Sequence, residues 1–202
     1  MLRNTEDRWG WLSKSFHWII AFAILVMVPV GYVMGATYAL EYENDNFAMV
    51  HMWLSRVHQS LGLIILIAVT FRLGWRLHNP SPNLPAGLAA YQRWLARLNH
   101  VFLYALLFVL PLSGWASLSA YGEAPTYFLW IDGLPNLVPK RPVDDPFGFS
   151  LYSGIHHFCI DAGAVLLSLH VVAALWHEFV KKDSVLRRMW PLTTGRAPRE
   201  PA

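Results

Sequence analysis

The stretch that decides the fold is residues 154–180, GIHHFCIDAGAVLLSLHVVAALWHEFV, which is long and apolar enough to cross a membrane as a helix. It carries two histidines, His156 and His170, that are fourteen residues apart. On an α-helix this spacing puts two side chains within about 40° of each other and roughly 21 Å apart along the axis. Gly163 lies between them on the same face, whereas His157 lies on the far side. The stretch therefore predicts a helix with one imidazole near each surface of the bilayer.

Two histidines on one face of a membrane helix are a candidate site. Ionisable side chains are costly inside a bilayer, and those that occur there usually face a bundle interior or a functional path. Gly163 would leave room beside them for a flat group. The alternative is that the histidines only hold helices together through interhelical hydrogen bonds. The residues of the other helices distinguish the two interpretations, because a bound group needs ligands from a second helix that faces this one.

The composition indicates an integral membrane protein. The 202 residues are 55% hydrophobic and 14% charged, include ten Trp, and have a mean hydropathy of +0.34. Four apolar runs have the length of a membrane span: residues 16–36, 57–77, 98–118 and 155–180. We therefore expect an all-α protein, an integral membrane four-helix bundle, built as a single transmembrane domain over residues 1–202.

The distribution of charge predicts the orientation. Thirteen of the sixteen Lys and Arg residues lie in the N-terminal arm, the connection between the second and third runs, or the C-terminal tail. The positive-inside rule then makes both termini cytoplasmic in a multi-pass membrane protein. The outer connections hold seven acidic residues against three basic ones, Arg56, Lys140 and Arg141. The net charge of +3 reflects a basic membrane-facing side, so we expect membrane lipid and no nucleic acid as a partner.

Depth in the membrane pairs the histidines. His17 opens the first run at the inner end and can meet His170, while His58 opens the second run at the outer end and can meet His156. Two opposed imidazoles in an apolar slot suit a low-spin b-type haem. A structural zinc site would need four close ligands, and a di-iron site would need several carboxylates, of which Asp161 alone is available. Haem is the interpretation that remains.

The single cysteine indicates how a haem could be attached, and the first apolar run indicates whether the N-terminus is cleaved. Cys159 cannot form an internal disulfide, and no CxxCH sequence is present, so any haem is bound without covalent links. The first run is too long for the apolar region of a typical signal peptide and carries His17, so we predict that it stays as a span.

Three other polar residues each have two interpretations. Arg72, fourteen residues after His58, either pairs with a haem propionate or extends to water as one of the basic inner residues. His100 has no histidine partner and is at most a quinone-binding or hydrogen-bonding residue. Asp161 lies opposite His170 and either accepts a hydrogen bond from another helix or carries protons.

The chain resembles the bacterial cytochrome b561 family over most of its length. The resemblance rests on KSFHWII at 14–20, VHQSLGLIILIAVTFRLGWRL at 57–77, and IHHFCIDAGAVLLSLHVVAALWHEFVKKDSVLRRMWP at 155–191, the most specific of the three. It implies a four-helix, multi-pass cytochrome of the bacterial inner membrane with two b haems, an inner one and an outer one. The residues that it implies as axial iron ligands are His17 and His170 for the inner haem, and His58 and His156 for the outer haem.

The resemblance also implies electron exchange with the quinone pool, and one type in the family oxidises superoxide outside and reduces ubiquinone. His177, near the inner end, matches a position for quinone binding, with Arg72 and His100 as further contacts; otherwise it is an interface histidine. The long acidic outer loops would repel superoxide unless Arg56, Lys140 and Arg141 form a local positive funnel. These loops could instead dock a periplasmic redox protein.

The sequence thus predicts a dihaem b-type cytochrome that transfers electrons across the membrane between the quinone pool and an outer-side donor or acceptor. Superoxide oxidation coupled to ubiquinone reduction is one form of this activity, which would make the protein an oxidoreductase; a quinol-linked electron carrier is the other. The alternatives are a haem-bearing anchor subunit of a larger periplasmic redox enzyme and a colourless membrane scaffold. No catalytic residue is assigned.

Overall fold

The structure, a computed structural model, describes residues 1–190 except 7, 41–43, 84–86 and 184. In chain order the elements are α1 (Trp11–Tyr38), α2 (Asp45–Leu77), α3 (Ala90–Tyr121), β1 (Tyr127–Phe128), β2 (Ile131–Asp132), α4 (Phe149–Trp176), the π-helical turn η1 (His177–Lys181) and α5 (Val185–Met189). Four of the described helices, α4 being extended by η1, are long and apolar enough to cross a membrane. The prediction of an all-α four-helix membrane protein is confirmed.

Each of the four long helices begins before its predicted apolar run. α2 has 33 residues, which makes it about 50 Å long, whereas the hydrocarbon core of a bilayer is about 30 Å thick. It begins at Asp45 rather than at residue 57, and the Asn44 side chain caps it by accepting a hydrogen bond from the Asn46 N–H at 2.8 Å. His51 therefore lies in a helix, where its Nδ1 is 3.1 Å from the Met34 carbonyl oxygen of α1.

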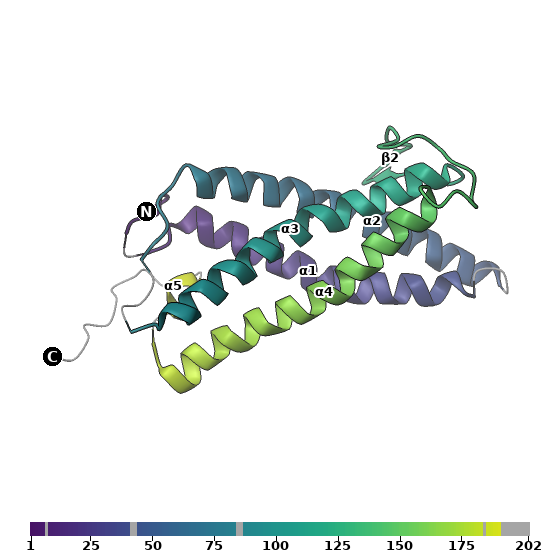
Figure 1. Ribbon diagram of the computed structural model, residues 1–202. Helices are drawn as coiled ribbons and strands as arrows, with labels where there is room; N and C mark the ends of the chain where they lie inside the picture. The colour runs from purple at the N-terminus through teal and green to yellow at the C-terminus, as the bar shows by residue number, and fades with distance from the viewer. Residues whose placement is uncertain (7, 41–43, 84–86, 184, 191–202) are drawn as a thin grey trace.

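The four long helices lie side by side in two packed pairs. α1 packs on α2 and α3 packs on α4, and contacts between α2 and α3 join the pairs. In Figure 1 the N-terminus and α5 lie at one end of the bundle, while the short β1–β2 hairpin lies at the other. We call these the inner end and the outer end. α4 passes from the outer end to the inner end, so its two histidines lie at different depths.

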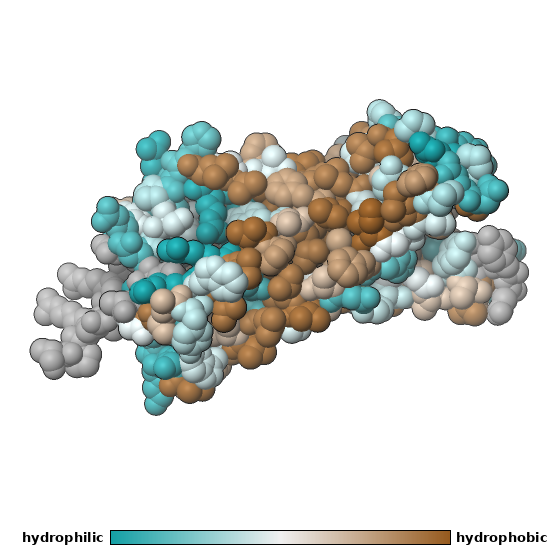
Figure 2. Space-filling model, viewed as in Figure 1, coloured by the Kyte–Doolittle hydropathy of each residue, from teal (hydrophilic) through white to brown (hydrophobic). Residues whose placement is uncertain are grey.

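Small side chains line the buried face of α3. The buried residues of α3 are Ser113, Ala116, Ser117, Ser119 and Ala120. Small residues let membrane helices approach closely, which replaces the hydrophobic driving force that a soluble protein would have. Figure 2 shows the complementary outer surface, with apolar side chains over the middle of the helices and polar side chains towards the two ends. This surface pattern suits a bilayer.

Candidate functional site

Two pairs of histidines face each other inside the bundle. At the inner end His17 of α1 faces His170 of α4, with 6.2 Å between the ring centroids and 62° between the ring planes. At the outer end His58 of α2 faces His156 of α4, again with 6.2 Å between the centroids and with 71° between the planes. The structure thus brings together the same residues that helix depth pairs, and α4 supplies one histidine to each pair.

The separation of the rings suits a metal ion between them. Two imidazoles that bind one ion from opposite sides have ring centres roughly 6 Å apart, since each metal–nitrogen bond is about 2 Å long. His100 also lies next to His170, but the centroids of these two rings are only 5.2 Å apart and their planes are at 88°. The pairs at 6.2 Å therefore fit opposed axial ligation better than His100 and His170 do.

In the outer pair, the Nδ1 atom of each ring faces a neighbouring helix, α3 for His156 and α1 for His58. His156 Nδ1 lies 2.9 Å from the Leu110 carbonyl oxygen and 3.3 Å from Ser113 Oγ, both on α3. Donation of Nδ1–H to the carbonyl fixes the tautomer, so the lone pair of Nε2 is left for a metal, as is usual for ligating histidines. His58 Nδ1 is buried and has no hydrogen-bond partner among the described residues.

Glycines on the neighbouring helices make room for the outer rings. A Cβ atom at Gly31 of α1 would lie 3.3 Å from His58 Cε1, and one at Gly114 of α3 would lie 3.3 Å from His156 Cε1. Gly163, which we expected to leave room between the two histidines of α4, instead faces Leu106, whose Cδ1 would be 3.8 Å from an added Cβ. The space beside the outer pair therefore depends on Gly31 and Gly114.

Cationic and polar side chains surround the inner pair. The Arg72 guanidinium lies 5.6 Å from the centroid of the Tyr104 ring, and that of Arg76 lies 5.5 Å from it. Arg72 is close enough to interact electrostatically with both His17 and His170. Arginine matches a carboxylate through paired N–H donors, so this end of the bundle can hold the propionates of a haem.

His100 and His177 occupy different surroundings at the inner end. His100 belongs to the cluster around the inner pair, and its Nδ1 lies 2.5 Å from the Ala96 carbonyl oxygen. His177 is the first residue of η1 and pairs with Asp183, with 2.5 Å between Nδ1 and Oδ2. Asp183 is a partner of His177 that the sequence did not predict. Its signal was an acidic residue just beyond the end of a helix that carries a histidine.

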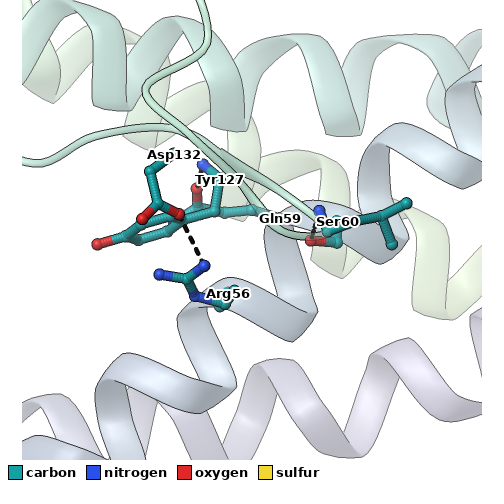
Figure 3. Close-up of polar contacts among 6 residues, drawn as sticks. Arg56, Gln59, Ser60, Tyr127 and Asp132 are labelled. Atoms are coloured by element: carbon teal, nitrogen blue, oxygen red, sulfur yellow. Dashed lines mark hydrogen bonds and ion pairs between the residues drawn. The ribbon is translucent and has the colours of Figure 1, made fainter.

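The outer loop is fastened to α2 through Arg56, Gln59 and Ser60 (Figure 3). The Tyr127 N–H donates to Gln59 Oε1 at 2.7 Å, and the Leu129 N–H donates to Ser60 Oγ at 2.8 Å. Arg56 lies over the Tyr127 ring, 4.3 Å from its centroid. The β1–β2 hairpin is therefore held over the outer end of the bundle.

The three outer cations do not form an unpaired positive funnel. Each one pairs with a carboxylate: Arg56 with Asp132 at 2.7 Å, Arg141 with Asp145 at 2.8 Å, and Lys140 with Glu123. The hydrogen bond from Arg141 holds the pKa of the Asp145 carboxyl below its usual range, so this pair stays ionised in neutral solution. An anion that approaches this face therefore meets cations whose charge is already balanced.

Two other candidates lie outside the site. Asp161 is exposed on the surface of α4, and within the described part of the chain it makes no hydrogen bond to another helix. His157 is also exposed, and its Nδ1 lies 2.8 Å from the Ser153 carbonyl oxygen of its own helix. Among the described residues no cluster of three or more His, Cys, Asp or Glu side chains could hold a metal ion. A metal ion bound by the described residues would therefore have two protein ligands, as in each histidine pair.

Four apolar helices around two facing histidine pairs, in a chain without a CxxCH sequence, define a membrane-bound cytochrome of the b type. The sequence model of the family described as prokaryotic cytochrome b561 matches residues 8–192. The chain belongs to this family. It is a multi-pass bacterial membrane protein that binds b-type haem and takes part in electron transfer.

Several curated proteins are similar to the chain over nearly its whole length. Cytochrome b561 homolog 2 of Escherichia coli K12 is 30% identical over 187 residues, which cover 92% of this chain and 93% of the relative. Cytochrome b561 homolog 1 of the same organism is 27% identical over 92% of this chain and 98% of the relative. A probable superoxide oxidase, CybB of Yersinia pestis, is 24% identical over 94% of this chain and 99% of the relative.

Proposed function

We propose that the protein is a dihaem cytochrome of the bacterial inner membrane that carries electrons between the quinone pool and a donor or acceptor on the outer side. His17 and His170 would hold the inner haem, and His58 and His156 the outer haem. The observation that carries the proposal is the equal 6.2 Å separation of two histidine pairs at opposite ends of α4. The whole chain would act as one transmembrane domain.

A haem held between two histidines would supply single-electron transfer. The chain orients the ligands and keeps water out. The Leu110 carbonyl fixes the ring of His156, and the small residues of α3 allow close packing of the helices around it. Arg72 supplies positive charge beside the inner pair, where haem propionates and quinone oxygens both need it.

The quinone is proposed to bind at the inner end. Arg72 and His100 lie beside the inner histidine pair, and His177 follows His170 by two helical turns. These side chains could donate hydrogen bonds or protons to quinone oxygens. Ubiquinone is the quinone that we propose.

A spectroscopic experiment tests the function. Reduced-minus-oxidised spectra and haem quantification on the purified protein should give two b haems per chain, and a reduced quinone should reduce them. A colourless protein from cells with adequate haem supply would contradict the proposal and leave a scaffold. Stable copurification of a larger periplasmic enzyme would favour an anchor subunit instead.

Superoxide is a second candidate for the outer donor, supported by the probable superoxide oxidase among the relatives. Because the outer cations are paired with carboxylates and acidic residues are in excess, we expect no electrostatic attraction of the anion. The rate of haem reduction by superoxide should then stay constant or rise as salt is added. Stopped-flow measurements at low and high ionic strength check this. A rate that falls steeply with salt would indicate a positive funnel after all.

The outer haem should be sensitive to the two glycines that face its ligands. Gly31→Ala would put a methyl group 3.3 Å from the His58 ring, which must then move by a few tenths of an ångström. Such overpacking costs about 1–3 kcal/mol, so we expect a shifted midpoint potential or lower occupancy of the outer haem only. Gly35→Ala is the matched control, because nothing lies within 4 Å of a Cβ there. Redox titration of both variants gives the comparison; equal behaviour would contradict the assignment.

A further inference from the structure

The backbone has two irregular features where α4 ends. The helix continues after Trp176 as the π-helical turn η1, and Lys182 then takes a left-handed backbone conformation with φ of 54°. π-helical turns are frequent at functional sites, and residues other than glycine rarely adopt a positive φ. These two irregularities turn the chain back, so that Asp183 reaches the ring of His177.

The two oxygens of Asp183 have separate partners. Oδ2 lies 2.5 Å from His177 Nδ1, and Oδ1 accepts a hydrogen bond from the Val185 N–H at 3.0 Å, which caps the start of α5. A carboxylate can only accept, so His177 must carry its proton on Nδ1. Its Nε2 then presents a lone pair when the ring is neutral and an N–H when the ring is charged.

The pair is partly shielded from water, and the charged groups of η1 and of the segments packed near it contact other partners. The side chains of His177 and Asp183 are 14% and 24% exposed. Glu178, the other acid of η1, accepts a hydrogen bond from Arg187 at 2.9 Å. Lys181 lies over the Trp176 ring, 5.0 Å from its centroid, and from α1 the Lys14 Nζ donates to the Trp190 carbonyl oxygen at 3.1 Å. Asp183 is thus the carboxylate in direct contact with the His177 ring.

The segment that holds Asp183 is fastened beside the inner histidine pair. Trp18 Nε1 donates to the carbonyl oxygen of Met189, at the end of α5, at 2.7 Å. Trp18 in turn packs edge-on against its neighbour His17, with 5.4 Å between the ring centroids. The position of α5 is therefore tied to α1 at the level of the inner pair, and the Asp183 carboxylate binds the N–H of Val185, the first residue of that helix.

We propose that Asp183 is a positioning residue, which orients His177 so that its Nε2 exchanges protons with the quinone at the inner end; this rests on the proposed quinone-linked function. Conversion of a quinone to a quinol consumes two electrons and two protons. For each electron that the cytochrome delivers, the Nε2–H bond of charged His177 breaks and an O–H bond forms on the quinone. Water at the inner surface reprotonates the ring, and quinol oxidation runs in the opposite sense. Asp183 holds the ring in the same orientation in both directions, through its contact with Nδ1.

The Asp183→Asn variant distinguishes the role of Asp183 in orienting His177 from its role at the start of α5. Asparagine caps helices as well as aspartate does, so its oxygen can keep the Val185 hydrogen bond and α5 stays in place. Its NH2 group then faces His177 Nδ1, which must accept instead of donate, and the proton moves to Nε2. We expect the rate of haem reduction by a ubiquinol analogue to fall about 100-fold, in kcat rather than in KM, with unchanged haem content. Dithionite should still reduce both haems fully.

Three comparisons decide the matter. His177→Gln should show a loss similar to that of Asp183→Asn, and the double variant should lose no more than either single one. If Asp183 only stabilises the start of α5, Asp183→Asn should behave like the wild type and Asp183→Ala should be impaired. That pattern would overturn the inference but leave the proposed function intact. If the quinol analogue did not reduce the wild-type haems, the proposed function would fail and this inference with it.

Discussion

Replacement of His156 by alanine is expected to remove the proposed outer haem and leave the proposed inner one. The variant loses one of the two rings that face each other across 6.2 Å, together with the Nδ1–H that anchors this ring to the Leu110 carbonyl oxygen. The haem content should fall from two to one per chain, and His58→Ala should have the same effect. His17→Ala and His170→Ala should remove the inner haem and keep the outer one.

The adjacent histidine provides a matched control for this prediction. His157 is exposed on the opposite side of α4, and its Nδ1 lies near a carbonyl oxygen of its own helix. His157→Ala should therefore retain both haems. Pyridine haemochrome analysis gives the haem number, and redox titration identifies which haem remains. Haem loss in His157→Ala together with full haem content in His156→Ala would refute the assigned helical face.

The fold and the pairing of the histidines could be predicted because both follow from fixed geometry. The rise and rotation of an α-helix determine where residues fourteen positions apart lie, and the bilayer limits the depth at which each helix can place a side chain. These two constraints predict that His17 lies near His170 and that His58 lies near His156. The structure brings the same rings together.

Other features depend on contacts that no local pattern encodes. Hydropathy reports only the part of a helix inside the hydrocarbon, so it could not predict that α2 begins at Asp45. The π-helical turn that brings Asp183 to His177 leaves no periodic signal in the sequence. The pairing of Arg56 with Asp132 joins residues that are 76 positions apart, through a hairpin whose docking the sequence alone does not reveal.

Replacement of Arg72 by leucine is expected to lower the midpoint potential of the inner haem and leave that of the outer haem unchanged. Reduction adds an electron to the site, and the Arg72 guanidinium, which interacts electrostatically with His17 and His170, favours that added charge. Hydrogen bonds to charged groups contribute about 1.5–3 kcal/mol. For one electron, 59 mV corresponds to about 1.4 kcal/mol, so the shift should be roughly 60–130 mV downwards.

Arg72→Lys distinguishes the charge of the side chain from its shape. Lysine keeps the positive charge but lacks the planar fork that binds a carboxylate through two N–H donors. If Arg72 pairs with a haem propionate, the lysine variant should show a smaller shift in the same direction, whereas an arginine that only extends to water predicts no shift in either variant. Potentiometric titration resolves the two haems separately. Equal shifts of both potentials would contradict the placement of Arg72 at the inner haem, because the outer pair lies at the opposite end of α4.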